Sequence, residues 1–344
     1  GTRTTWGARP YEEQVIDTTA AVVERLDEAG AVLIAKLTLG ALAMGDVWYG
    51  ETTRNPWNPE QGSSGSSAGP ASAVGAGCVA FAIGSETCGS ILSPSARCGV
   101  SSLRPTFGRV SRRGAMALSW SMDKLGPMCR SLDDAAIVTA VVAGRDPLDE
   151  ETVDRPFSDP GPADVSGLRV GFVEGSFGDE QAELELLASL EGLGCELVAV
   201  ELPVPAAGEL FFVLSAEAAA AFDELTRSGR DDELVRQGRG AWPNLLRSSR
   251  LVPAVEYIQA NRARRALIEQ VEQLFDRVDV LVHPTGDHVV TLNLTGHPSA
   301  CAPWTMRENG TPRSVAFTAG LYQDATLLAL ASAWQRAGTY HLVH

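Results

Sequence analysis

Lysine is almost missing from this 344-residue sequence, which has only Lys36 and Lys124 among its 28 basic residues. Positive charge in general is scarce, because the formal net charge is −15 and local basic runs such as 109–113 are short. An acidic surface repels the phosphate backbone, so we expect no nucleic-acid partner. The scarcity of lysine also restricts which residues can act as an amine base.

Long hydrophobic runs and paired cysteines are missing as well. No stretch reaches the roughly 18 consecutive apolar residues of a membrane-spanning helix, so we expect no membrane partner. The six cysteines form no C-x-x-C pair, which argues against structural zinc and gives no disulfide framework. We therefore expect a reducing, cytoplasmic location. Residues 1–10 have neither an initiator Met nor a signal-peptide pattern, and we expect the chain to begin inside a longer protein.

The sequence is rich in apolar residues, at 44%, which is enough to bury a large core. Apolar residues at helical spacing over 18–30 end on Gly30 and lead into 31–35, a short run with strand character. The polar, proline-rich segment 145–167 is expected to be a loop. Similar units follow, namely helices over 131–144, with a capping pattern at Ser131 and Asp134, 179–194 and 253–275, and strands over 168–173, 196–202 and 278–285. This alternation predicts an α/β fold.

Two runs of small residues, 62–77 and 83–99, surround the apolar segment 78–83, which a flexible linker would not contain. The first run allows three interpretations. It could be a surface loop, or a phosphate-binding loop, although the lysine of G-x-x-x-x-G-K-[ST] is missing. It also matches G-x-S-x-G with Ser67 at the centre, but that motif requires a preceding strand. Because 53–64 contains two prolines and no apolar run, we do not expect Ser67 to be a nucleophile.

The second run offers a better nucleophile, Ser90, which follows the apolar segment 79–83 through a turn of small residues. The backbone N–H groups from Thr87 to Ser90 could converge on one oxygen, as an oxyanion hole requires. A serine hydroxyl also needs a base to accept its proton. All five histidines lie far downstream, and each is expected to be an ordinary loop or core-edge residue.

Segments 64–77 and 84–91 together resemble the signature of the amidase signature family, G-G-S-S-G-G-S followed by G-T-D-x-G-G-S-I. Aligned without gaps, Ser66 and Ser90 fall on the two catalytic serines of that family. The resemblance extends over nearly the whole chain. Further matching segments are 28–45, 54–58, 98–111, 123–131 and 293–303.

The resemblance implies an amide hydrolase with an α/β/α fold, in which helices cover both faces of a central mixed sheet within a single domain over 1–344. It implies a Ser-Ser-Lys triad, in which a neutral lysine accepts a proton from Ser66, Ser66 relays one from Ser90, and Ser90 attacks the carbonyl. The backbone N–H groups of Thr87, Cys88, Gly89 and Ser90 would form the oxyanion hole, and the Gly65–Ser66 peptide bond would be cis. No metal or organic cofactor is implied. The expected partner is a small-molecule amide, and a second copy of the chain, in a homodimer, is a further candidate.

Two departures from the family pattern concern the base and the oxyanion loop. The family's base lies in a K-D motif upstream of a G-x-x-T-x-x-G segment, which this chain shows at 1–7. Neither Lys36 nor Lys124 matches that position, so we expect the base to precede Gly1 and the chain as given to have little activity. Cys88 replaces a glycine, and its thiol is an alternative nucleophile that has no basic neighbour in sequence.

Two other functions stay open. The chain could be the A-type subunit of a tRNA-dependent amidotransferase, which would use ammonia released at the serine and would need a partner subunit. It could also be a non-catalytic homologue that binds an amide. A K-D motif upstream of Gly1 would favour the enzyme over the binding protein, and no segment indicates the substrate.

Overall fold

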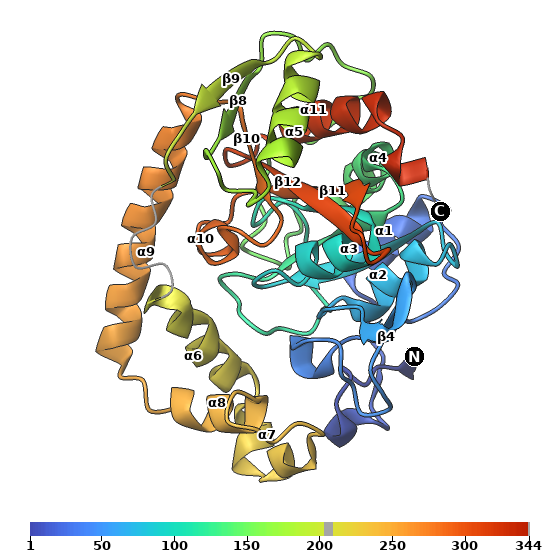
Figure 1. Cartoon of the computed structure of the whole chain (residues 1–344). Coiled ribbons are helices and arrows are strands. Elements are labelled where there is room, and N and C mark those ends of the chain that lie inside the picture. Colours follow the sequence, from blue (N-terminus) through green and yellow to red (C-terminus); the bar gives the residue numbers. More distant parts are fainter. Residues whose placement is uncertain (203–208, 343–344) are drawn as a thin grey trace.

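The computed structural model describes residues 1–202 and 209–342. Figure 1 shows a central sheet with α4, α5 and α11 gathered at one end of the molecule and α6, α7 and α8 at the other. The long helix α9 runs along one side between these two groups. The helices are α1 (Ala21–Glu28), α2 (Ala68–Gly75), α3 (Leu92–Cys98), α4 (Leu132–Val142), α5 (Glu180–Glu191), α6 (Phe212–Ala221), α7 (Asp223–Arg227), α8 (Trp242–Ser249), α9 (Ala254–Phe275), α10 (Val289–Leu294) and α11 (Asp324–Ala337).

Eight strands form the central sheet in the order β5-β7-β6-β11-β12-β10-β8-β9. Strand β8 pairs in parallel with β9 and β10, and the other neighbours are antiparallel, so the sheet is mixed as expected. Two smaller sheets pair β1 with β2 and β3 with β4. The strands are β1 (Thr2–Arg3), β2 (Val15–Ile16), β3 (Arg54–Asn55), β4 (Asn58–Gly62), β5 (Phe81–Glu86), β6 (Ser101–Arg104), β7 (Lys124–Cys129), β8 (Arg169–Phe172), β9 (Glu196–Ala199), β10 (Val280–Pro284), β11 (Ser299–Met306) and β12 (Pro312–Ala319).

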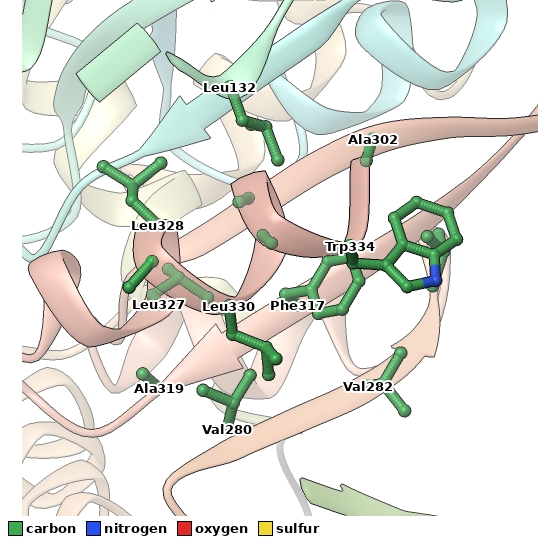
Figure 2. Close-up of a cluster of buried hydrophobic side chains, with 14 of the residues drawn as sticks. Leu132, Val280, Val282, Ala302, Phe317, Ala319, Leu327, Leu328, Leu330 and Trp334 are labelled. Carbon is green, nitrogen blue, oxygen red and sulfur yellow. The ribbon is translucent and has the colours of Figure 1, made fainter. Parts of the chain in front are cut away.

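Helices cover both faces of the sheet. Successive side chains of a strand point to opposite faces, so the apolar side chains of one strand pack against helices on both sides. In β7, Met128 belongs to a core cluster with Ala71 and Val74 of α2, whereas its neighbour Cys129 packs in a cluster with Leu132 of α4. Figure 2 shows the second cluster, where Trp334 of α11 lies beside Phe317 of β12. The two aromatic rings are 5.5 Å apart. The α/β/α arrangement predicted from the sequence is therefore confirmed.

Most of the expected elements form close to their predicted bounds. Ser131 caps α4, since its hydroxyl accepts a hydrogen bond from the Asp134 N–H at 3.1 Å. The segments expected at 168–173, 179–194, 196–202, 253–275 and 278–285 contain β8, α5, β9, α9 and β10. Segment 145–167 forms no helix or strand, in agreement with the predicted loop. Within the described residues, no helix is both long and apolar enough to cross a membrane.

The strand expected over 31–35 is wrong. This segment forms no strand, and Val32, Leu33 and Ile34 are 84%, 72% and 72% exposed. A strand needs a neighbour that pairs with its N–H and C=O groups, and this run has no such neighbour within residues 1–202 and 209–342. Apolar composition alone therefore overestimated its burial.

The prediction for the region before Ser67 is also wrong. Residues 53–64 were expected to contain no strand, but β3 and β4 form an antiparallel hairpin there. The hairpin is separate from the central sheet, and β4 ends at Gly62. A Cβ on Gly62 would lie 2.0 Å from an Asp46 carboxylate oxygen, so this close approach needs glycine.

Candidate active site

The turn that carries Ser90 connects β5 to α3. Its left-handed position is Gly89, with φ of +88°, and the Gly89 carbonyl accepts the Ser93 N–H at 2.8 Å. Glycine suits this position, because a Cβ at residue 89 would lie 3.1 Å from a Val289 methyl group. Cys88 does not adopt a positive φ, so the turn accommodates a side chain there.

The expected oxyanion-hole groups are free to bind a ligand. Outside the regular strand pairings, no N–H from Thr87 to Ser90 donates a hydrogen bond to another described residue. The Thr87 side chain is held separately, since its hydroxyl donates to an Asp123 carboxylate oxygen at 2.6 Å. Asp123 in turn accepts the N–H groups of Leu118 and Ser119 at 2.8 and 2.9 Å. This network fixes the start of the turn while its backbone donors remain available.

Ser66 lies directly beside the Ser90 turn. The Ser67 N–H donates to the Ser90 carbonyl at 3.1 Å, which joins the two small-residue segments. The Gly65–Ser66 peptide bond is cis, as the resemblance implied. Ser66 is only 1% exposed, and its hydroxyl has no hydrogen-bond partner among the described residues. Ser90 is partly exposed, so a ligand can reach it while Ser66 stays buried.

Ser67, the centre of the G-x-S-x-G match, has a structural position. Its hydroxyl donates to the Ser85 carbonyl at 3.0 Å and accepts the Ser85 N–H at 3.0 Å. Both bonds tie the start of α2 to β5. The hydroxyl is therefore occupied by the backbone, which agrees with the expectation that Ser67 is not the nucleophile.

A buried ion pair underlies the turn. Glu86, at the end of β5, lies 2.9 Å from the Arg104 guanidinium of β6, and both side chains are fully buried. The second Glu86 oxygen accepts the N–H groups of Ile91 and Leu92 at 2.7 and 3.0 Å, which anchors the chain immediately after Ser90. Burial alone would raise the pKa of Glu86, but the Arg104 charge and these hydrogen bonds hold it at about 2.

Lys124 lies opposite Glu86 in the β5–β7 pairing and is 2% exposed. Its amine donates to the Met122 carbonyl. Burial, followed by the charge of Arg104, lowers the pKa of Lys124 to about 7. Sequence reasoning missed this cluster, although charged residues at the ends of apolar strands were a usable signal.

Lys36 lies elsewhere and is exposed. Its amine contacts the Thr4 hydroxyl and the Arg3 carbonyl, and partial burial of the amine lowers its pKa. Lys36 lines one wall of a cavity of about 560 Å³, which also contains Ser66 and Ser67. The remaining walls are mostly apolar and include 31–39, β5 and part of α1.

Cys88 and the histidines give no better alternative. Burial, followed by the charge of Glu86, raises the pKa of the Cys88 thiol to about 11, which disfavours the reactive thiolate. His283 pairs with the Thr318 hydroxyl at 3.0 Å, and His297 with Glu272 at 2.8 Å. Within the described residues, no histidine forms a hydrogen bond with Ser66 or Ser90.

Comparison with known proteins places this chain in a family. The sequence profile of the family described as Amidase matches residues 1–289. The A subunit of glutamyl-tRNA(Gln) amidotransferase from Roseiflexus castenholzii is 34% identical, and the match covers 99% of this chain and 80% of that protein. The corresponding protein of Thermotoga maritima superposes with a TM-score of 0.83 at 28% identity, covering 99% of this chain and 81% of the other. The native peptide amidase of Stenotrophomonas maltophilia gives a TM-score of 0.83 at 27% identity, with coverage of 97% and 79%. The chain therefore belongs to the amidase family, the amidase signature enzymes that act on carbon–nitrogen bonds.

Proposed function

We propose that Ser90 is the nucleophile of this amide hydrolase and that Ser66 relays its proton. The observation that carries the proposal is the contact between the two serine segments, where Ser67 N–H meets the Ser90 carbonyl at 3.1 Å and leaves the adjacent Ser66 hydroxyl without a partner. A buried hydroxyl without a hydrogen bond is costly, and proton transfer gives it a use.

In the proposed reaction, Ser90 Oγ attacks the amide carbon while its proton passes to Ser66. The N–H groups of the turn from Thr87 to Ser90 stabilise the negative charge that develops on the carbonyl oxygen. The C–N bond then breaks as the nitrogen receives a proton, which leaves an acyl group on Ser90. Water attacks this ester, and Ser90 regains its proton as the carboxylic acid leaves.

The base that serves Ser66 is proposed to be a lysine of an upstream K-D motif, in keeping with the family pattern. The cavity of about 560 Å³ beside Ser66 provides room for it. Its apolar walls would lower the pKa of a buried amine, as a neutral base requires. Lys36 shares the cavity but already contacts Thr4 and Arg3 and is exposed. Lys124 donates to Met122 and lines no part of this cavity.

Activity measurements with a protein that includes the K-D segment test the proposal. Release of ammonia from simple amides should disappear in Ser90→Ala, because the nucleophile is lost. Ser72→Ala is a matched control, since that serine lies on α2 and bonds to the Arg54 carbonyl. Lys36→Ala should retain turnover, whereas replacement of the K-D lysine should abolish it. Loss of turnover in Lys36→Ala alone would contradict the assignment of the base.

A second candidate function is that of the A-type component of a tRNA-dependent amidotransferase. The observation that favours it is the 34% identity to the Roseiflexus castenholzii protein. A component of this kind should release ammonia from glutamine in preference to other amides and pass it to its partner. Turnover of simple amides at a rate equal to or above that of glutamine, with no partner present, would favour the hydrolase.

The proposal also covers the location of the protein, its domain organisation and its oligomeric state. We place the protein in a reducing cytoplasm, which is supported by six cysteines that are all free thiols. We also propose that residues 1–344 form a single domain and that two copies of the chain form a homodimer. Sedimentation analysis of the purified protein tests the dimer.

A further inference from the structure

Residues 113–123 lead into β7 and form no helix or strand. The end of this loop contacts the proposed oxyanion turn, since the Asp123 carboxylate accepts the Thr87 hydroxyl at 2.6 Å. Because the loop has no strand ladder or helix to fix it, side chains that accept its N–H and O–H groups determine its position. The position of Thr87 therefore depends on what holds residues 118–123.

Glu217 of α6 holds the middle of this loop. One of its carboxylate oxygens accepts the Ser119 hydroxyl at 2.5 Å and the Ser121 N–H at 3.1 Å, and the other accepts the Ser121 hydroxyl at 2.7 Å. The second oxygen also accepts the Tyr257 hydroxyl of α9 at 2.6 Å. Two helices that lie far downstream in sequence are therefore connected to the loop before β7.

The negative charge of Glu217 makes these hydrogen bonds strong. The residue is 6% exposed, and burial alone would raise its pKa, but the hydrogen bonds that it accepts hold the pKa below its usual range. The carboxylate is therefore ionised, and an ionised acceptor forms stronger hydrogen bonds than a neutral one. Arg264 of α9 holds the same loop, because it donates to both the hydroxyl and the carbonyl of Ser121 at 2.7 Å.

Ser119 joins Glu217 to Asp123. Its hydroxyl donates to Glu217, while its N–H donates to the Asp123 carboxylate at 2.9 Å. Ser119 is fully buried, and its carbonyl accepts the Asp123 N–H at 2.9 Å. A continuous series of hydrogen bonds therefore runs from Glu217 through Ser119 and Asp123 to the Thr87 hydroxyl.

Apolar packing gives a second, independent connection between α6 and the turn. Leu118 and Met122 of the loop belong to the same buried cluster as Leu214 of α6. Cys88 packs against this cluster, and it directly follows Thr87 in the turn. The turn is therefore connected to α6 through packing as well as through hydrogen bonds.

We propose that Glu217 is a positioning residue for the reaction at Ser90, and that it keeps the N–H groups of the turn from Thr87 to Ser90 directed at the carbonyl oxygen of the substrate. The inference rests on the proposed function, because it requires that oxygen to bind at this turn. Glu217 acts at a distance, through Ser119 and Asp123. Donors held in place in advance stabilise the transition state more than the bound substrate, so the effect should appear in kcat and leave KM nearly unchanged.

Steady-state kinetics on the protein that includes the K-D segment test this inference, with butyramide, benzamide and glutamine as substrates. For the fastest of these, Glu217→Ala should lower kcat about tenfold and change KM less than about twofold. This loss is smaller than the roughly 10²-fold cost of deleting an oxyanion donor, because the donors are misplaced and not removed. Glu217→Gln should recover part of the rate, since the amide keeps one acceptor oxygen.

Glu183→Ala is the matched control. Glu183 lies on α5, is also buried, and accepts the N–H groups of Gly175 and Phe177 at 3.0 and 3.3 Å. Its loss should reduce the free energy of unfolding, as measured with urea, without lowering kcat. An equal fall of kcat in Glu183→Ala would show that any loss of stability slows the enzyme, which would overturn the inference.

A double substitution separates positioning from a general loss of stability. Thr87→Val removes the hydroxyl that Asp123 accepts and should itself lower kcat. Because Glu217 is proposed to act through Thr87, adding Glu217→Ala to Thr87→Val should lower kcat little further. If Glu217→Ala does not fold, Tyr257→Phe, which removes one donor to Glu217, takes its place in the same comparison.

Two outcomes of these measurements would contradict the positioning role alone. One is an unchanged kcat in Glu217→Ala, and the other is a double variant whose fold-loss equals the product of the two single fold-losses. Absence of turnover in the parent protein would overturn the proposed function, and the inference with it. Turnover in the parent therefore distinguishes failure of the inference from failure of the proposed function.

Discussion

At the scale of single residues, Ser66 and Ser90 differ in exposure in the way that their proposed roles require. Ser66 is buried and its hydroxyl has no partner among the described residues, whereas Ser90 is partly exposed beside free backbone N–H groups. A nucleophile must be accessible to the substrate, whereas a relaying hydroxyl needs only to reach the nucleophile and the base. The two residues should therefore behave as one functional unit.

Double substitution tests this unit in a protein that includes the K-D segment. Ser66→Ala combined with Ser90→Ala should lose little more activity than the worse single variant, because either change interrupts the same proton transfer. Steady-state rates of ammonia release from one amide give the comparison. If the fold-loss of activity in the double variant equals the product of the two single fold-losses, Ser66 has only a structural role.

Lys124 makes stability depend on pH. Its folded pKa of about 7 lies below its ordinary value of 10.5, so between these limits the unfolded chain holds a proton that the folded chain does not. The free energy of unfolding should therefore rise with pH over this window, by up to about 1.4 kcal/mol per pH unit. The Lys124→Met variant has no amine to titrate, so its free energy of unfolding should lack this pH dependence. The variant should therefore exceed the parent protein in stability at pH 7, and the difference should shrink towards pH 10.

Urea unfolding of both proteins at several pH values measures this difference, and groups common to both cancel. Lys124→Gln provides a second comparison if the methionine variant folds poorly. A stability difference that stays constant from pH 7 to pH 10 would show that Lys124 is not held neutral by its surroundings.

Sequence reasoning predicted local structure where a motif was present, and missed side-chain pairings that depend on packing. The turn between β5 and α3 follows from the small residues after the apolar segment 79–83, and the cis Gly65–Ser66 bond was implied by the resemblance to the amidase signature family. The catalytic roles of Ser66 and Ser90 stay predictions. The ion pair between Glu86 and Arg104 joins β5 to β6, and Lys124 lies opposite Glu86 on β7. This cluster therefore depends on the order of the strands in the sheet. Strand order requires long-range pairing, which a single sequence does not display.

At the scale of elements, capped helices were predicted more reliably than short strands. A helix forms its own hydrogen bonds, and α4 carries its starting signal in Ser131 and Asp134. A strand depends on its neighbours, which explains why 31–35 was expected as a strand but is exposed, and why the β3–β4 hairpin was missed.

The cap of α4 gives a direct stability test. Ser131→Ala should reduce the free energy of unfolding by about 1 kcal/mol, because the Asp134 N–H loses its acceptor. Ser131→Asp should restore most of this loss, since a carboxylate accepts the same bond and suits a helix N-terminus. Urea denaturation measures all three proteins. Equal stability of the alanine variant and the parent would show that the capping bond contributes nothing.

At the scale of the whole molecule, the sheet explains how the site is assembled. Strand β5 lies at one edge of the central sheet and delivers the Ser90 turn, while the segment that carries Ser66 crosses beside it before α2. Figure 1 shows α2 and α3 close together, next to the strands that they cover. The amidase family provides this scaffold, and the cavity of about 560 Å³ lies beside Ser66.

The central claim is that Ser90 forms the covalent bond to the substrate, and labelling with a fluorophosphonate tests it most directly. The protein that includes the K-D segment would be treated with the reagent, digested, and mapped by mass spectrometry. We expect a single adduct on Ser90, which Ser90→Ala abolishes and Ser66→Ala strongly slows. An adduct on Ser67 or Cys88 instead, with Ser90 unmodified, would contradict the account.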